Sequence, residues 1–186
     1  MGRVLELGCG NGRNATYLAS LGCTVDAVDF SARAIAWATR RANRAGVAVS
    51  FQCGSIFDAN FTDQSYDLVY DSGCLHHLAP HHRQDYADLV RRALKPRGSY
   101  GLVCFRPEGG SGYTDQEVYD KGSLGGGLGY TEHQLRALWN TPPFTVRELR
   151  QMTRTAEHDP YFGEDFLWTL LASKKEPGGN YLRATA

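Results

Sequence analysis

The chain has 186 residues, the length of one domain of roughly 100–200 residues and too short for a two-domain enzyme. Its 20 Lys and Arg side chains balance 20 Asp and Glu side chains, so no overall charge attracts a nucleic acid or an anionic lipid surface. No apolar run approaches the ~18 residues of a membrane-spanning helix, and the first residues lack the pattern of a signal peptide. We therefore expect a cytoplasmic protein without membrane attachment.

The cysteines argue against two kinds of structural support. There are five of them, an odd number, and none forms a C-x-x-C pair. This is unlike a disulfide framework or a four-thiolate zinc site. We expect reduced thiols.

The first half of the chain alternates short apolar runs with segments of helical spacing. The first run stops at Gly8, and Ala15, Leu18 and Ala19 then fall on one helix face. The pattern predicts strands over residues 4–7, 24–29 and 47–53, a helix over 13–21, and a second helix between an N-cap at Ser31 and Gly46.

The second half contains the strongest predicted helix. Tyr86, Leu89, Val90, Ala93 and Leu94 lie at i, i+3, i+4, i+7 and i+8. The other predicted elements are strands over 66–71 and 100–105, a helix after a capping box at Thr131 and Gln134, and strands over 144–152 and 166–173, which lack a helix between them and should pair antiparallel.

Residues 107–130 interrupt this alternation. The segment is rich in glycine, including Gly125, Gly126 and Gly127, and shows no helical or strand period. A connection of this length inside a compact domain is typical of a functional or mobile loop, so we expect a substrate lid. Residues 174–186 have the composition of a flexible tail, and the predicted domain is 1–173.

The alternation of strands and helices predicts an α/β fold. Such a chain forms a doubly wound, mostly parallel sheet with helices on both faces. Ligands bind beyond the carboxyl ends of its strands, beside the first strand. Because the first strand begins at residue 4, we expect no preceding segment to cover that site, as in a fragment of a longer chain.

The turn after the first strand carries the strongest functional pattern. Its sequence, V-L-E-L-G-C-G-N-G, places glycines at 8, 10 and 12, where a backbone can approach a ligand closely. Glu6 stands two residues before this turn, and a buried carboxylate is costly unless a cation or several donors meet it. A pyrophosphate would be repelled, whereas an ammonium group would bind. The alternative is a solvated carboxylate at a strand end.

Two further segments fit a nucleoside. Asp29 ends the second strand about 20 residues after the first glycine, where an acidic side chain accepts both ribose hydroxyls. Ser55 and Ile56 follow the third strand and would lie beside the base, with Phe30 flanking the same ring. Ordinary packing explains each of these residues better when it is taken alone, and the argument for a nucleoside is that the features occur together in the expected order.

In these segments the sequence resembles the class I S-adenosylmethionine-dependent methyltransferases. The matching stretches are V-L-E-L-G-C-G-N-G-R-N, V-D-A-V-D-F-S, C-G-S-I, Y-D-L-V-Y-D-S-G-C-L-H-H-L and A-L-K-P-R-G-S-Y-G-L-V. The resemblance implies seven strands in the order 3-2-1-4-5-7-6 with strand 7 antiparallel, and the family's usual helix before strand 1 has no counterpart here. It implies S-adenosylmethionine as cofactor, bound by Glu6, Gly8, Cys9, Gly10, Asn11, Gly12, Asp29, Phe30, Ser55, Ile56, Asp71 and Ser72.

The segment after the fourth strand holds the candidate catalytic residues. Asp71, His76 and His77 are placed near the transferred methyl group, and a histidine can accept a proton from a hydroxyl or a thiol. A histidine that only packs or caps is an equal alternative. The four histidines at 76, 77, 81 and 82 share no convincing ligand spacing with a carboxylate or thiolate, so we expect no metal.

The acceptor is less defined by the sequence. The chain has neither the N-P-P-Y type of signature of base methylation nor the Asp-Asn end of strand 5 found in magnesium-dependent catechol enzymes. We therefore predict that the methyl acceptor is a small molecule and not a nucleic acid. The oligomeric state is left open between a monomer and a homodimer. Two alternatives remain, a thiol or thiopurine S-methyltransferase, which residues 71–75 resemble loosely, and a non-catalytic cofactor-binding domain. The residues expected to cover the acceptor are Tyr113, Tyr119, Tyr130, Tyr161 and Phe162.

Overall fold

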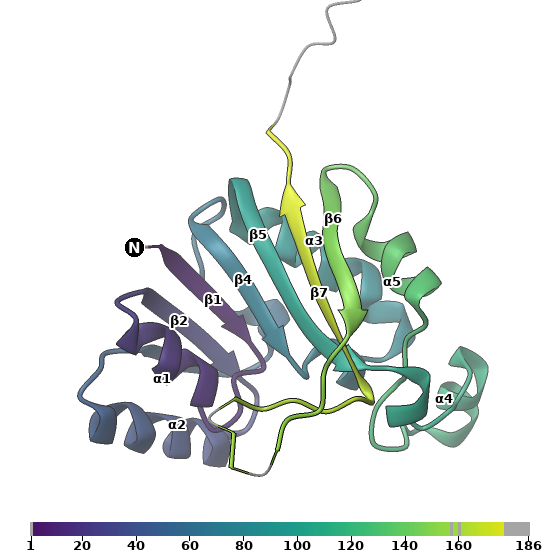
Figure 1. Cartoon of the computed structure of the whole chain (residues 1–186), viewed down its shortest axis with the longest axis horizontal. Coiled ribbons are helices and arrows are strands. Elements are labelled where there is room, and N and C mark those ends of the chain that lie inside the picture. Colours follow the sequence, from purple (N-terminus) through teal and green to yellow (C-terminus); the bar gives the residue numbers. More distant parts are fainter. Residues whose placement is uncertain (1, 157, 160, 177–186) are drawn as a thin grey trace, which may run out of the picture.

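A seven-stranded sheet forms the centre of the molecule (Figure 1). The computed structural model describes residues 2–156, 158–159 and 161–176. The strand order β3-β2-β1-β4-β5-β7-β6 confirms the order that the sequence implied. The strands are β1 (Arg3–Leu7), β2 (Thr24–Asp29), β3 (Ser50–Cys53), β4 (Tyr66–Ser72), β5 (Leu94–Phe105), β6 (Phe144–Gln151) and β7 (Leu167–Lys174).

The pairing of the strands brings three strand ends level with one another. β1 pairs in parallel with β2 on one side and β4 on the other, and Leu7 lies opposite Val28 and Asp71. β7 runs antiparallel between β5 and β6. The turns that follow β1, β2 and β4 therefore emerge together at one edge of the sheet, where a ligand can contact all three.

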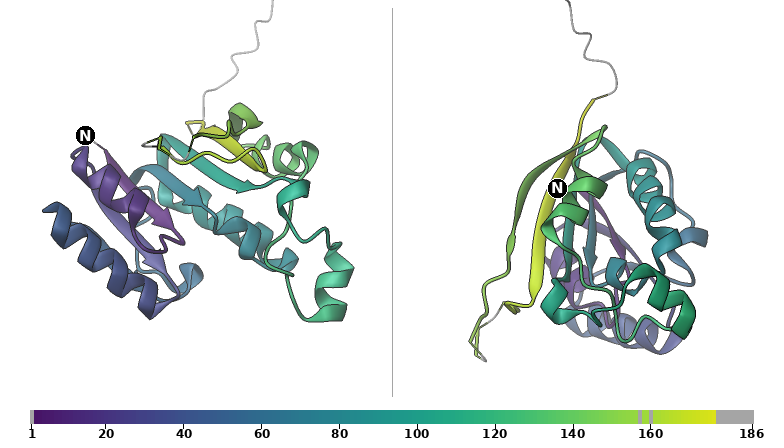
Figure 2. Two further views of the ribbon diagram at one scale, coloured as in Figure 1. Left: turned by 60° about the horizontal axis from the view of Figure 1, so that its bottom comes forward. Right: turned by 90° about the vertical axis from the view of Figure 1, so that its right-hand side faces the viewer.

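Helices lie on both sides of the sheet (Figure 2). The pair α1 and α2 packs against β2 and β3, whereas α3 packs against β4 and β5, and α5 packs against β6. Their bounds are α1 (Arg13–Ser20), α2 (Ala32–Ala45), α3 (Arg83–Ala93), α4 (Asp115–Lys121) and α5 (Glu132–Trp139). None of the helices in the described ranges combines the length and the apolar character that crossing a membrane requires.

The core under α3 confirms the periodicity of that helix. Tyr86, Leu89, Val90 and Ala93 are all buried, as their helical spacing predicts. Tyr86 meets the indole ring of Trp139 edge-on at 6.1 Å between ring centres. This packing fixes α3 beneath β4 and β5, and with it the segment that follows β4.

Three boundaries differ from the sequence prediction. α3 ends at Ala93 and β5 already begins at Leu94; Arg97, inside β5, has a φ of +64°, and the register between β4 and β5 shifts between the Tyr66–Leu94 and Leu68–Ser99 pairs. β3 begins at Ser50 instead of residue 47. The expectation that 107–130 has no regular structure is wrong, because Thr114 caps α4 and forms a capping box with Glu117.

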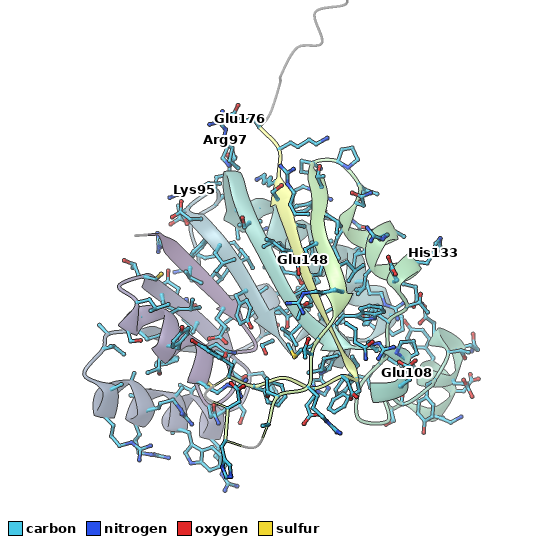
Figure 3. All side chains as sticks on the ribbon, viewed as in Figure 1. Lys95, Arg97, Glu108, His133, Glu148 and Glu176 are labelled. Carbon is cyan, nitrogen blue, oxygen red and sulfur yellow. The ribbon has the colours of Figure 1, made fainter. Side chains whose placement is uncertain are left out.

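The end of β7 is tied to the sheet. The amino group of Lys174 donates hydrogen bonds to the carbonyl oxygens of Arg91 and Leu94, both at 2.6 Å. Arg97 and Glu176 form an ion pair of 2.9 Å at the sheet edge opposite the glycine turn (Figure 3). Of the predicted tail, residues 177–186 lie outside the described residues.

Candidate functional site

The three glycines after β1 serve different purposes. Gly8, Gly10 and Gly12 have φ values of +66°, +52° and +72°, which favour glycine. A Cβ at Gly8 would lie 2.7 Å from that of Cys74, and one at Gly12 would lie 2.6 Å from that of Ala38. A Cβ at Gly10 would meet nothing within 4 Å. The turn is therefore packed at both ends and open in the middle, where a ligand can approach the backbone.

Glu6 presents an incompletely bonded carboxylate beneath this turn. Its side chain is 1% exposed. Oε1 accepts a hydrogen bond from Nδ2 of Asn14 at 3.2 Å, whereas Oε2 is buried without a partner. Burial raises the pKa of Glu6 from 4.5 to about 7, although the bond from Asn14 and the nearby backbone N–H of Ala15 oppose the rise. A cation at Oε2 would supply the missing partner and return the carboxyl group to its ionised form.

Glu6 and the open part of the turn line the same cavity. This cavity, the turn cavity, has a volume of about 310 Å³. Six of the eight residues that line it were predicted from the sequence to bind the cofactor. Its lining is Glu6, Gly8, Cys9, Gly10, Asn11, Arg13, Asn14 and Ser72.

Asp29 braces the glycine turn. Its Oδ2 accepts a hydrogen bond from the backbone N–H of Gly10 at 2.8 Å, and its Oδ1 accepts one from Ser31 at 2.8 Å. A carboxylate has about four lone-pair sites, so both oxygens can accept further hydrogen bonds. Asp29 is half-buried and can therefore hold the turn and contact a ligand together.

A second cavity lies on the other side of Gly8. This cavity, the β2–β3 cavity, has a volume of about 450 Å³. Phe30 is 84% exposed at its rim, and Ile56 is buried in its wall. The hydroxyl of Ser55 accepts a hydrogen bond from the N–H of Phe57 at 3.2 Å. The residues predicted to hold a ribose and a base thus share one cavity, lined by Gly8, Asp29, Phe30, Ser55, Ile56, Phe57, Gly73, Cys74, His77 and Leu78.

Asp71 lies behind the site. It has no exposed surface and lines neither cavity. Its Oδ1 accepts a hydrogen bond from the N–H of Cys74 at 2.6 Å, and Oδ2 accepts bonds from the N–H of Leu75 at 2.9 Å and from the hydroxyl of Tyr86. Burial raises the pKa of Asp71 to about 6 against these bonds. The structure therefore places Asp71 as a support of the turn after β4, without the predicted contact to a ligand.

His76 is also a structural side chain in this arrangement. It is 5% exposed, and its ring stacks on Phe105 at 3.8 Å between centres. Its Nδ1 accepts a hydrogen bond from the N–H of Phe105 at 3.2 Å. Burial, and secondarily His77, lower the pKa of His76 to about 3. Nδ1 is engaged by the backbone, so the structure does not present His76 as a base.

His77 faces the β2–β3 cavity. It is exposed and lies beside Gly8 and Leu78 in the lining. Partial burial lowers the pKa of His77 below its usual value, so the ring is neutral near neutrality and able to accept a proton. Of the two adjacent histidines, His77 is the one that lines the β2–β3 cavity.

His81 and His82 form contacts of their own. The hydroxyl of Tyr119 lies 3.0 Å from Nδ1 of His81, and the ring of His82 lies 5.0 Å from that of Phe57. Across the described part of the chain, no three His, Cys, Asp or Glu side chains are arranged to hold a metal ion.

Comparisons with known proteins agree with this geometry. The methyltransferase domain family matches residues 4–98. An uncharacterized methyltransferase of Synechocystis is 36% identical over 101 residues, and a 2-heptyl-1-hydroxyquinolin-4(1H)-one methyltransferase of Mycobacteroides abscessus is 33% identical over 107 residues. These matches cover 54% and 56% of this chain, which spans 46% of the length of each relative.

A solved structure extends the agreement to nearly the whole fold. The 1,6-didemethyltoxoflavin-N1-methyltransferase of Burkholderia thailandensis, with its substrate and S-adenosylhomocysteine bound, has a TM-score of 0.70 at 24% identity and covers 94% of this chain and 72% of its own. The chain belongs to the class I S-adenosylmethionine-dependent methyltransferases. S-adenosylmethionine is accordingly its cofactor. The ammonium group of that cofactor is a cation of the kind that the free oxygen of Glu6 requires.

The α4 segment of this methyltransferase is fixed to α3. The guanidinium group of Arg83 donates two hydrogen bonds to Asp115, at 2.7 and 2.9 Å, and one to the hydroxyl of Tyr130 at 3.2 Å. No residue of 107–130 lines the turn cavity or the β2–β3 cavity. A lid role for this segment remains a prediction.

Sequence reasoning missed some residues that line the methyltransferase site. Asn14 and Arg13 line the turn cavity, and Cys74 and Leu78 line the β2–β3 cavity. Asn14 could have been inferred, because the first turn of a helix that follows a glycine turn faces the ligand of that turn. No sequence pattern pointed to Cys74, because its position depends on how the segment after β4 bends.

Proposed function

We propose that this chain transfers a methyl group from S-adenosylmethionine to a small-molecule acceptor. The observation that carries the proposal is the buried Oε2 of Glu6, which lacks a partner at the wall of a cavity whose middle glycine leaves room for a ligand. An unpartnered carboxylate of this kind destabilises the folded protein, and an ammonium group removes that cost.

The proposed roles of the binding residues follow from the two cavities. Glu6, oriented by Asn14, receives the ammonium group in the turn cavity. Asp29, which lines the β2–β3 cavity, accepts the ribose hydroxyls through its remaining lone pairs. The adenine ring lies in the β2–β3 cavity against Ile56 and Phe30. Gly8 borders both cavities, so a single extended molecule can occupy them together.

The chemistry requires alignment more than it requires a base. The cofactor supplies an electrophilic methyl group on a sulfonium, and transfer is an in-line displacement. Holding acceptor, methyl group and sulfur in line contributes several kcal/mol, up to ~7–11 in intramolecular reactions. A base is needed only where the acceptor is a weak nucleophile. For a hydroxyl acceptor we propose that His77 accepts the proton.

The relatives support a small acceptor. The Mycobacteroides relative is named for a quinolone and the Burkholderia structure for a didemethyltoxoflavin. Both are small molecules, and neither is a nucleic acid or a protein. Since this chain spans 46% of the first of these relatives and is 24% identical to the second, they support the class of acceptor and not its identity.

The test has two steps. Isothermal titration calorimetry with S-adenosylmethionine and S-adenosylhomocysteine measures cofactor binding, and a radiolabelled methyl donor then measures transfer to phenols, thiols, carboxylates and a mixed tRNA sample. We expect cofactor binding and transfer to a phenol or a thiol. Binding without transfer to any small molecule would favour a non-catalytic binding domain, and transfer to tRNA alone would contradict the proposed acceptor.

A further inference from the structure

The helix α2 concentrates positive charge at the outer margin of the molecule (Figure 2). Residues 30–57 contain no aspartate, glutamate or lysine, and their four arginines are Arg33, Arg40, Arg41 and Arg44. Arg41 is half-buried and donates a hydrogen bond from Nε to the carbonyl oxygen of Asn11 at 3.1 Å, whereas the other three are exposed. Because the whole chain has no net charge, α2 is a local positive surface on an otherwise balanced protein.

The arginines of α2 differ from most others in lacking an acidic partner. Elsewhere arginines form ion pairs, such as Arg83 with Asp115 at 2.7 Å and Arg136 with Glu132 at 2.8 Å. Within the described ranges, no arginine of α2 pairs with a carboxylate. A solvated helix face normally carries both signs of charge, so α2 differs from an ordinary solvated face.

These charges are placed where they weaken the helix. Arg40 and Arg44 lie four residues apart, and like charges at that spacing repel each other across one helical turn. Arg33 stands in the first turn, where the helix dipole disfavours a cation, and that turn holds no acidic residue. The first turns of α4 and α5 do hold acidic residues. An anionic partner would relieve the repulsion that α2 carries in the free protein.

An aromatic side chain lies within the charged face. Arg33, Trp37, Arg40 and Arg44 stand at i, i+4, i+7 and i+11, so they form one stripe along the helix, the α2 stripe. The buried Ala42 lies on the opposite side. Trp37 is 47% exposed, and the guanidinium carbon of Arg33 lies 5.1 Å from its ring centre. Tryptophan and arginine are enriched at protein–protein interfaces, where lysine is depleted.

The dimensions of the α2 stripe fit a helical partner. Spacings of four, three and four residues are those of the seam along which two helices pack side by side. From Arg33 to Arg44 the stripe is about 16 Å long at 1.5 Å per residue, a length that a short helix spans. Nucleic-acid-binding surfaces spread their cations over a longer path, whereas here Asp29 and Asp58 bound the segment in sequence and the rest of the chain has balanced charge.

We propose that the α2 stripe is a docking surface for an acidic α-helix of a partner protein. Carboxylates of that helix bind the exposed arginines, whose forked guanidinium groups match carboxylate geometry. An apolar side chain of the partner packs on Trp37 beside Arg33. This inference uses only the surface of α2 and does not rest on the proposed methyl transfer.

The test uses a fluorescein-labelled helical peptide, the seam peptide, which carries glutamate at the seam positions that face the three exposed arginines and leucine at the position that faces Trp37. Fluorescence anisotropy with the full chain measures its affinity. We expect the seam peptide to bind at least about tenfold more tightly than the same peptide with glutamine for glutamate, since charge-assisted hydrogen bonds are lost. An isomeric peptide with its glutamates distributed around the helix should also bind at least about tenfold more weakly.

Two variants locate the binding surface. The triple variant Arg33→Gln, Arg40→Gln, Arg44→Gln should weaken binding of the seam peptide at least about tenfold, and glutamine keeps a good helix former at each position. Trp37→Ala should weaken binding about fivefold. Both variants should leave the affinity for S-adenosylhomocysteine unchanged. The matched control is Arg136→Gln, which removes an exposed helical arginine from α5 and should not change peptide binding.

Three results would overturn the inference. They are absence of binding of the seam peptide, equal binding of the seam peptide and its isomer, and binding that survives the triple substitution. A labelled oligouridine is the probe for nucleic acid. If it binds more tightly than the seam peptide and loses affinity in the triple variant, α2 is a nucleic-acid surface and the proposal is wrong. Since the substituted side chains are exposed, thermal melting should show that the variants remain folded.

Discussion

Replacing Glu6 by glutamine should change stability and cofactor affinity in opposite directions. Glutamine has the size of glutamate and keeps an oxygen for the hydrogen bond from Asn14, but it carries no charge. In the free protein the buried charge of Glu6 is a cost, whereas in the complex it is the partner of an ammonium group. If Glu6 only filled space, its replacement by glutamine would not raise the stability and lower the cofactor affinity at the same time.

The size of the stability effect follows from the pKa of Glu6. The pKa rises from 4.5 to about 7 on folding, and at about 1.4 kcal/mol per pH unit this corresponds to about 3 kcal/mol. Below pH 4.5 the carboxyl group is protonated in both states. As the pH rises, the unfolded chain loses its proton first, so the free energy of unfolding falls until the pH exceeds about 7. At pH 8, Glu6→Gln should therefore raise the free energy of unfolding by up to about 3 kcal/mol.

The binding effect has the opposite sign. A hydrogen bond to a charged group contributes about 1.5–3 kcal/mol, so Glu6→Gln should weaken S-adenosylhomocysteine binding roughly 10- to 150-fold. The affinity of the unsubstituted protein should also fall as the pH drops below about 7, where a proton competes for the carboxylate, and the variant should lack this dependence. Urea unfolding at pH 5 and pH 8, and calorimetry across the same range, measure both effects. A variant that is destabilised at pH 8, or that binds the cofactor as tightly as the original protein, would refute the reasoning.

Four further substitutions test other parts of the site. Gly12→Ala should lower the free energy of unfolding by more than about 2 kcal/mol. The added Cβ would clash with Ala38, and residue 12 has a positive φ that disfavours alanine. Gly10→Ala should lower the free energy of unfolding by only about 1 kcal/mol, because its Cβ meets no other atom, but it should prevent cofactor binding. Similar urea midpoints for Gly10→Ala and Gly12→Ala would contradict this difference in stability. Asp71→Asn should destabilise the protein by roughly 2–4 kcal/mol, since it replaces an acceptor of three buried hydrogen bonds, and an unchanged urea midpoint would argue against its supporting role. His77→Ala should slow methylation of a phenol more than that of a thiol, which needs less help to lose its proton; equal slowing would remove the case for a base.

The parallel part of the fold follows from sequence because its determinants are local. Buried strands are continuous apolar runs, and the glycine turn after β1 marks its own position. The helix α5 was predicted from Thr131 and Gln134, whereas α4, which has the same capping box at Thr114 and Glu117, was missed. The reason is length, since a helix of seven residues with one buried apolar side chain has no measurable period.

The site was less predictable where it depends on tertiary contacts. Glu6 and Asp29 were predicted from their spacing to the glycine turn, and each lines a cavity beside that turn. Asp71 and His76 were assigned to the ligand because they follow β4, but the side chain of Asp71 turns to Tyr86 and that of His76 stacks on Phe105. Neither partner is close in sequence. Composition and spacing therefore predicted which edge of the sheet carries the cavities, and only packing distinguishes the residues that line them from the residues that support them.

The most direct measurement is a crystal structure of the chain with S-adenosylhomocysteine. The account predicts the amino group within hydrogen-bond distance of Oε2 of Glu6, the ribose hydroxyls at Asp29, and the adenine ring beside Ile56 in the β2–β3 cavity. A ligand whose amino group lies away from Glu6, or whose nucleoside lies outside the β2–β3 cavity, would contradict it.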